Sequence, residues 1–262
     1  MTKTGSYLPQ QAPSTAAESA RLMAQARAIF EREDAALRRA GLGDGGRLLD
    51  VGCGPGHWLV QLRAAHRPSV VLGVERDPLH ARHALTQLPV VRGDAAALPL
   101  RDGAFDAVTM RLVLRHLTQP AAALAELARV TRVGGVVCVL DADDGGLLLH
   151  NAPASFAPLW EALRVTAVRR GANPHVGRAL PGLLAGAGLQ NISLEPLVVT
   201  TLELEPPAFV ELLLAPGARP VDVDLMEREA VARAWEDLRA WARRDGAFGL
   251  AVGMLATGTR MP

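Results

Sequence analysis

The sequence predicts an α/β fold, in which a mostly parallel sheet is covered by helices on both faces. Short, continuously apolar segments alternate with segments of helical periodicity along residues 47–142. Continuous apolar runs are typical of strands buried on both faces, and parallel strands need helical crossovers between them. A glycine-rich turn at residues 50–56 also joins the first of these strands directly to a helix.

The elements follow one another in a regular order. Residues 1–15 are polar and predict a loose arm, whereas residues 16–40 repeat apolar side chains at helical spacing. Gly41 and Gly43 end that helix. Strands are then predicted at 47–51, 69–75, 89–94, 105–112 and 134–142, with helices at 57–65, 78–88 and 120–132.

The alternation stops after residue 143. Two helical segments, 153–170 and 174–188, follow each other without an intervening strand. We expect the helices between 145 and 188 to form a cap over the carboxyl edge of the sheet. The remaining segments are a strand at 191–204, helices at 206–214 and 222–245, and a strand at 248–260, and the two strands are expected to complete the same sheet.

Composition excludes several classes of protein. Lys and Arg number 28 against 27 Asp and Glu, so the net charge of +1 gives no field for a nucleic-acid backbone or an acidic membrane. Cys53 and Cys138 are far apart, which predicts neither a disulfide framework nor a structural zinc site. No apolar segment resembles a signal peptide or a membrane span. The expectation is a cytoplasmic protein with no metal, no nucleic-acid partner and no membrane contact.

The glycine-rich turn suits a bound ligand. Gly52 and Gly54 permit backbone geometry and a close ligand approach that a Cβ would block, and donors at a helix N-terminus suit a polar or anionic group. Dinucleotide-binding loops follow the pattern G-x-G-x-x-G, whose last position is here His57. Two interpretations of Asp50 stay open: it contacts the ligand, or it fixes the loop by accepting backbone N–H groups.

Two acidic residues end the next two strands. Glu75 is placed to accept both hydroxyls of a ribose that lies over the glycine loop, although it could also be a solvated strand end. Asp94 can accept a hydrogen bond from the exocyclic amine of an adenine, or can cap the turn that follows it. The ligand-binding interpretation is preferred for both residues.

Five segments resemble the successive motifs of class I S-adenosylmethionine-dependent methyltransferases: LLDVGCGPG, GVERD, GDAAALPL, FDAVTMRLVLRHL and ELARVTRVGGVVCVLD. The similarity is strongest to the branch that contains ubiquinone/menaquinone-type enzymes and small-molecule methyltransferases of bacterial secondary metabolism. It covers residues 47–142 and is weaker at 171–189, which resemble a cap segment. Tyr7, Arg21 and Gln25 resemble positions of the family's lid helix.

The resemblance implies S-adenosylmethionine as cofactor and assigns roles by position. It implies that Tyr7, Arg21 and Gln25 close over the cofactor, with Arg21 reaching its carboxylate. The other cofactor contacts that it implies are Gly52, Cys53 and Gly54 at the methionine part, Glu75 at the ribose, Arg76, Asp94 and Ala95 at the adenine, and Arg111 near the sulfonium. We add Asp50 and His116 as candidate cofactor contacts.

The resemblance also implies a Rossmann-like, seven-stranded sheet with appended helices. The expected organisation is an N-terminal arm and lid helix over 1–40, a cofactor-binding core over 41–144, a helical cap over 145–190, and a C-terminal completion of the sheet over 191–262. The cap and the arm are expected to enclose a small-molecule acceptor, and a homodimer is possible.

A general base is needed only if the acceptor must lose a proton early. The candidates are His116, His150, His175 and Tyr7, in no order of preference, and each histidine could instead be structural or exposed. Arg178 could bind an acidic substrate or satisfy helix carbonyls. Asp141, Asp143 and Asp144 lack neighbouring His or Cys ligands, so solvation and helix capping are preferred over a metal site.

Three other functions compete with small-molecule methyl transfer. A nucleic-acid or protein methyltransferase would favour a basic face, and the amino-methylating motif [DN]-P-P-[YFW] is absent because the fourth strand continues as Met110-Arg111-Leu112-Val113. A non-methylating S-adenosylmethionine-binding protein would share the fold. A nicotinamide-dependent dehydrogenase is disfavoured by the glycine spacing.

Overall fold

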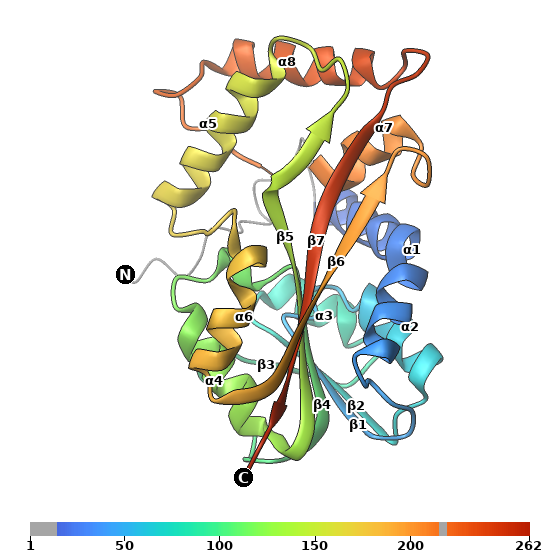
Figure 1. Ribbon diagram of the computed structural model, residues 1–262, viewed down its shortest axis with the longest axis vertical. Coiled ribbons are helices and arrows are strands. Elements are labelled where there is room, and N and C mark those ends of the chain that lie inside the picture. The colour runs from blue at the N-terminus through green and yellow to red at the C-terminus, as the bar shows by residue number, and fades with distance from the viewer. Residues whose placement is uncertain (1–14, 215–218) are drawn as a thin grey trace.

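The computed structural model describes residues 15–214 and 219–262 (Figure 1). Within these residues a seven-stranded sheet has the order β3-β2-β1-β4-β5-β7-β6, and β7 runs antiparallel to both of its neighbours. The mostly parallel α/β sheet predicted from the sequence is thus confirmed. Its strands are β1 (Arg47–Val51), β2 (Val70–Glu75), β3 (Val90–Arg92), β4 (Phe105–Arg111), β5 (Thr131–Leu149), β6 (Leu189–Thr200) and β7 (Gly249–Arg260).

Helices lie on both faces of this sheet (Figure 1). Those of the described residues are α1 (Thr15–Arg39), α2 (His57–His66), α3 (Pro78–Ala84), α4 (Pro120–Val130), α5 (Phe156–Arg169), α6 (Val176–Gly186), α7 (Pro206–Ala208) and α8 (Arg228–Trp241), with the 3-10 helix η2 (Leu114–His116) and the π-helix η3 (Phe209–Leu214). Each of these helices is too short or too polar to cross a bilayer.

The two faces of the sheet bury separate apolar clusters. Neighbouring residues of a strand point to opposite faces, so on β1 Leu49 packs in the cluster with α4 and α6, whereas Leu48 packs in the cluster with α1 and α2. The carboxyl ends of β1, β2 and β4 lie side by side because these strands are parallel and pair in register, with Asp50 opposite both Gly73 and Thr109. The residues that follow these ends therefore meet at one edge.

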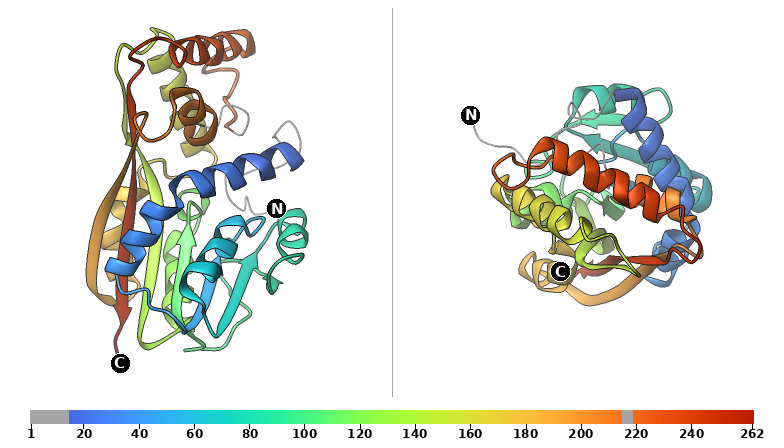
Figure 2. Two further views of the ribbon diagram at one scale, coloured as in Figure 1. Left: turned by 90° about the vertical axis from the view of Figure 1, so that its right-hand side faces the viewer. Right: turned by 90° about the horizontal axis from the view of Figure 1, so that it is seen from above.

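The cap consists of α5, η3 and α8, which stand beyond the sheet (Figures 1 and 2). They share a third apolar cluster that includes Leu159, Phe209 and Trp241. Helix α1 crosses below the cap, on the face of the sheet that also carries α2 (Figure 2). It contacts α2, η3 and β6. The cap thus contains the C-terminal helices η3 and α8 as well as α5, which belongs to the predicted segment.

Helix α6 was expected to belong to the cap, but it packs against the sheet instead. Val176, Leu180 and Leu184 are buried against the sheet, where α6 contacts β5, β7 and β6. An amphipathic pattern identifies the apolar face of a helix without identifying the surface that covers it. The predicted cap range 145–190 therefore contributes α5 to the cap and α6 to the layer that covers the sheet.

Strand β5 is longer than the predicted 134–142. After a register shift, pairing with β7 continues at Leu148 opposite Leu250. Residues 143–149 lie beyond the predicted strand, yet they pass directly beside β7. A Cβ on Gly146 would lie 2.6 Å from the Val252 Cβ, so the close approach of the two strands requires glycine here.

Candidate functional site

The glycine loop leaves β1 and enters α2 through three left-handed glycines. Gly52, Gly54 and Gly56 have φ values of 76, 56 and 85°. A Cβ on Gly52 would lie 2.5 Å from Val113 Cγ2, whereas a Cβ on Gly54 would meet no atom within 4 Å. Gly52 is thus required by packing, and Gly54 leaves open space above the loop.

A single cavity of about 390 Å³ extends from this loop to the cap. It is lined by His116 and by eleven of the residues assigned to the cofactor from the sequence, namely Arg21, Gln25, Asp50, Gly52, Cys53, Gly54, Glu75, Arg76, Asp94, Ala95 and Arg111. Tyr7 lies outside the described residues. The structure therefore gathers every described cofactor candidate around one space.

Glu75 holds the glycine loop in place. Its Oε2 accepts the Gly54 N–H at 2.8 Å, and its Oε1 accepts the Asp77 N–H at 2.7 Å. The Gly52 and Cys53 N–H groups donate to the carbonyl oxygen of Val74. The loop is thus fixed by β2, and Glu75 is not simply a solvated strand end.

Asp50 is buried beneath the loop and contacts β4. Its side chain is 2% exposed, and its Oδ1 accepts the Thr109 hydroxyl at 2.8 Å. Burial raises the pKa of Asp50 to about 7, against the lowering effects of the Thr109 hydrogen bond and the Arg111 charge. A carboxylate that lines the cavity and changes charge near neutral pH is available to a ligand.

Asp94 makes the turn contact that was the alternative to adenine binding. Its Oδ1 accepts the Ala96 N–H at 2.9 Å, as Asp commonly does in turns. Its side chain also lies at the cavity wall. The two interpretations are compatible, because a carboxylate offers more than one lone pair to donors.

A buried ion pair joins α1 to the end of β4, and its acidic partner, Glu33, was not among the residues expected at the site. The Arg111 Nε lies 2.9 Å from both Glu33 carboxylate oxygens, and the Trp58 Nε1 donates to Glu33 Oε2 at 2.6 Å. Glu33 is only 2% exposed. The signal was present in the sequence: Glu33 interrupts the apolar face of α1, four residues after Ile29 and four before Leu37.

The lid-helix residues contact the cap. Arg21 Nη1 and Gln25 Nε2 donate to the Leu212 carbonyl at 2.9 and 3.1 Å. The Arg21 guanidinium also pairs with the Glu18 carboxylate, at 2.9 and 2.7 Å. Arg21 therefore ties α1 to η3 in this structure, and its assignment to the cofactor carboxylate stays a proposal.

The histidine candidates separate by position. His116 lines the cavity, and burial together with the charges of Arg115 and Arg219 lowers its pKa to about 3. His150 is exposed and contacts Asn151, away from the cavity, because the extension of β5 carries it past the sheet. His175 lies 3.3 Å from Asp143 and does not line the cavity. Of the described base candidates, His116 alone faces the space where an acceptor could bind.

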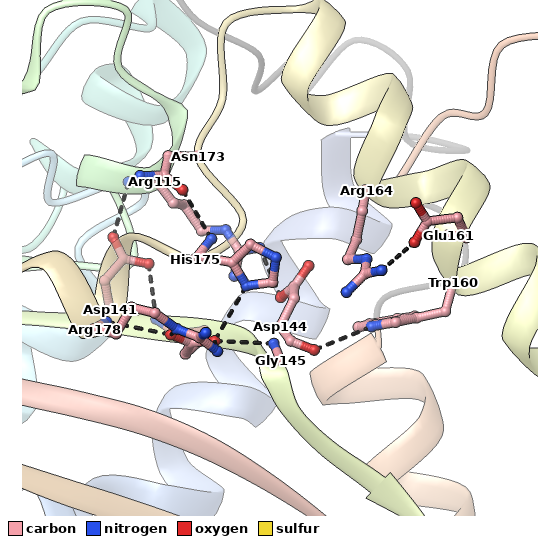
Figure 3. Close-up of polar contacts among 12 residues, drawn as sticks. Arg115, Asp141, Asp144, Gly145, Trp160, Glu161, Arg164, Asn173, His175 and Arg178 are labelled. Atoms are coloured by element: carbon pink, nitrogen blue, oxygen red, sulfur yellow. Dashed lines mark hydrogen bonds and ion pairs between the residues drawn. The ribbon is translucent and has the colours of Figure 1, made fainter.

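The aspartates in the second half of β5 are buried in an ion-pair network and are not solvated as expected (Figure 3). Asp143 pairs with Arg178 at 2.6 Å, which accounts for Arg178 without a substrate. Asp141 Oδ2 accepts the Arg115 N–H, and Asp144 pairs with the Arg115 side chain at 2.8 Å. The described residues contain no group of three or more metal-ligating side chains.

Residues 49–139 match the methyltransferase domain family. A demethylmenaquinone methyltransferase of Roseiflexus castenholzii is 41% identical over 101 residues, which are 37% of this chain and 42% of that protein. The chain thus spans less than half the length of this quinone-type relative. A methyltransferase of Strobilurus tenacellus is 30% identical over 193 residues, which are 70% of this chain and 67% of that protein.

The chain belongs to the class I S-adenosylmethionine-dependent methyltransferases. A putative methyltransferase from an antibiotic biosynthesis pathway of Anabaena variabilis has the same fold, with a TM-score of 0.64 at 20% identity over 87% of this chain and 96% of that one. The resemblance and the Rossmann-like fold expected from the sequence are confirmed. S-adenosylmethionine is accordingly the methyl donor of this methyltransferase.

The cavity of this methyltransferase fits that donor. Gly54 leaves the space above the loop open. The Asp50, Glu75, Asp94 and Arg111 side chains line the same space, and they offer acceptors and a cation to a ligand that carries both charges. We propose that Asp50, Glu75, Asp94 and Arg111 contact the donor with the backbone of the glycine loop.

Donor affinity is expected to rise about tenfold between pH 6 and pH 8. The ionised fraction of Asp50 increases as the pH passes its pKa of about 7, and the sulfonium cation favours the ionised carboxylate. Calorimetric titration with S-adenosylmethionine across this range measures the effect. Asp50→Asn should flatten the profile, and S-adenosylhomocysteine, which lacks the sulfonium charge, should show a smaller dependence. A profile that persists in the variant would assign the titration to another group.

Proposed function

We propose that this enzyme transfers a methyl group from S-adenosylmethionine to a small molecule that binds in the cap half of the cavity. The observation that carries the proposal is the continuity of the space: the same cavity that includes the glycine loop also reaches Leu163 of α5 and Leu214 of η3. An acceptor seated against these apolar side chains would share one continuous cavity with the donor. The similarity to a demethylmenaquinone methyltransferase supports an acceptor of this size.

The sulfonium supplies an already activated methyl group, so the protein's main task is alignment. Holding nucleophile and methyl carbon at about 3 Å can lower the barrier by several kcal/mol. Asp50, Glu75 and the loop backbone position the donor from the sheet edge, while α5 and η3 form the facing wall. The His116 ring, with its pKa of about 3, stays neutral at physiological pH and offers a weak proton acceptor beside the acceptor space.

A larger acceptor is disfavoured by the charge of the chain. A nucleic-acid methyltransferase needs a basic face for the phosphate backbone, whereas the net charge here is +1. We therefore expect turnover with a low-molecular-weight acceptor and none with transfer RNA or a peptide library.

A mass-spectrometric screen tests the proposed function. The full chain is incubated with S-adenosylmethionine and a panel of quinones, phenols, amines and carboxylic acids. The expected result is at least one product heavier by one methyl substitution, formed together with an equal amount of S-adenosylhomocysteine. Gly54→Leu serves as the control that blocks the donor site. Turnover with the nucleic-acid or peptide arm and with none of the small molecules would refute the proposal.

A further inference from the structure

Two arginines from distant segments converge on one aspartate at the cap end of the cavity. Arg115 Nη2 lies 2.8 Å from Asp144 Oδ1, and Arg219 Nη2 lies 2.6 Å from Asp144 Oδ2. All three side chains line the cavity, and their exposed fractions are 13% for Arg115, 19% for Arg219 and 5% for Asp144. Two guanidinium groups therefore share a single carboxylate at this wall.

The other acids nearby are also engaged. Asp143 lines the cavity too, and it pairs with Arg178, which does not. Asp141 lies outside the lining, where its carboxylate accepts the backbone N–H groups of Arg115 and Ala142. The third arginine of this wall, Arg170, pairs with Asp222 at 2.9 Å. The charges of Asp141 and Asp143 act on Arg115 together with that of Asp144, whereas the ion-pair partner of Arg219 is Asp144, which it shares with Arg115.

Burial and charge act differently on the two arginines. Burial lowers the pKa of Arg219, and the charge of Arg115 adds to this lowering, while Asp144 opposes it. The pKa of Arg115 is instead raised, because the charges of Asp144, Asp141 and Asp143 oppose its burial. A guanidinium that is removed from water is costly unless an opposite charge compensates for it, so Arg219 is the arginine with the weaker compensation.

The Arg219 guanidinium is also held in a fixed orientation. Its Cζ lies 4.4 Å from the centre of the Trp160 ring, within cation–π distance. Trp160 is itself fixed, because it is 8% exposed and its Nε1 donates to the Asp144 carbonyl at 3.3 Å (Figure 3). A guanidinium has five N–H donors in a planar fork, which matches the two oxygens of a carboxylate.

The remaining wall is apolar. Leu147, Leu163 and Leu214 line the same end of the cavity. A ligand that matches both features has an apolar or aromatic body and one anionic oxygen group. We propose that the acceptor of this enzyme is a carboxylic acid, whose carboxylate binds Arg115 and Arg219 while its body packs against these leucines. This inference rests on the proposed function, because it places the acceptor in the cap half.

Binding measured without turnover tests the inference. The full chain is saturated with S-adenosylhomocysteine and titrated by calorimetry with 4-hydroxybenzoate, cinnamate and octanoate, each beside its neutral amide. We expect each acid that binds to do so at least about tenfold more tightly than its amide. In Arg219→Gln this preference should fall to about twofold or less, whereas Arg219→Lys should retain part of it. No preference for any acid in the wild-type protein would overturn the inference.

Matched controls show whether the acid preference arises at Arg219 itself. Arg164 lies on the same helix as Trp160 and pairs with Glu161 outside the cavity lining, so Arg164→Gln should leave the preference unchanged. Affinity for S-adenosylhomocysteine should also be unchanged in Arg219→Gln. A loss of that affinity would assign the arginines to the donor's own carboxylate and overturn the inference. Acid preference without any methyl transfer would instead refute the proposed function and leave the carboxylate subsite standing.

Discussion

Replacing Gly54 by leucine is expected to lower the affinity for S-adenosylmethionine by about 100-fold. The Cβ position of Gly54 opens onto the cavity with no atom within 4 Å, so a leucine side chain would occupy donor space without disturbing the protein's own packing. Overpacking of a well-fitted site costs about 1–3 kcal/mol, and each 1.4 kcal/mol is a factor of about ten in affinity. Calorimetric titration of the variant measures the loss.

Gly188→Leu is the matched control for backbone strain. Gly188 has φ 81°, no atom within 4 Å of its Cβ position, and no place in the cavity lining. Both variants should lose a similar ~1–2 kcal/mol of stability, because each puts an L side chain in the left-handed region. Only Gly54→Leu should lose affinity for S-adenosylmethionine. Equal affinities in the two variants would remove Gly54 from the donor site.

Truncation of Glu33 to alanine is expected to lower the free energy of unfolding by about 3–5 kcal/mol. The substitution leaves the Arg111 guanidinium buried without its anion, and breaking one partner of a buried pair typically costs that much. It also removes the acceptor of the Trp58 N–H. Urea unfolding monitored by tryptophan fluorescence gives the difference in free energy at an unchanged m value.

Two companion variants identify the cause of that loss. Glu31 is exposed on the same helix, so Glu31→Ala should change stability by no more than about 0.5 kcal/mol. The double variant Glu33→Leu/Arg111→Met removes both charges and should recover part of the loss, because no buried charge is left unpaired. A cost below about 1 kcal/mol for Glu33→Ala would show that water reaches Arg111.

The parts of this enzyme that could be predicted from sequence are those with local causes. The strands and the loop at 50–56 follow from apolar runs and from glycine positions, which act within a few residues. The extension of β5 was missed because the continuous apolar run ends near Ala142, and the strand continues only by pairing with the distant β7. The location of α6 was missed because an apolar face does not specify its partner.

The charged residues of the site could likewise be predicted only where their position has a local cause. The location of Glu75 beside the glycine loop could be predicted from its place at the end of the second strand, because the order of elements fixes where strand ends meet. Asp144 could not, since its partners are Arg115 and Arg219, 29 and 75 residues away along the chain. Whether a carboxylate is solvated or paired in the interior depends on such distant groups, and no local pattern records them.

The long pairing of β5 with β7 restrains the cap against the sheet. These strands run from the sheet into the cap, with pairs at both Asp141–Met254 and Leu149–Gly249. Rotation of the cap away from the core would have to break this backbone ladder, whereas moving α1 breaks side-chain contacts such as those of Arg21 and Gln25 to Leu212. The cap is therefore continuous with the sheet through paired backbone, whereas α1 is tied to the cap by side-chain contacts.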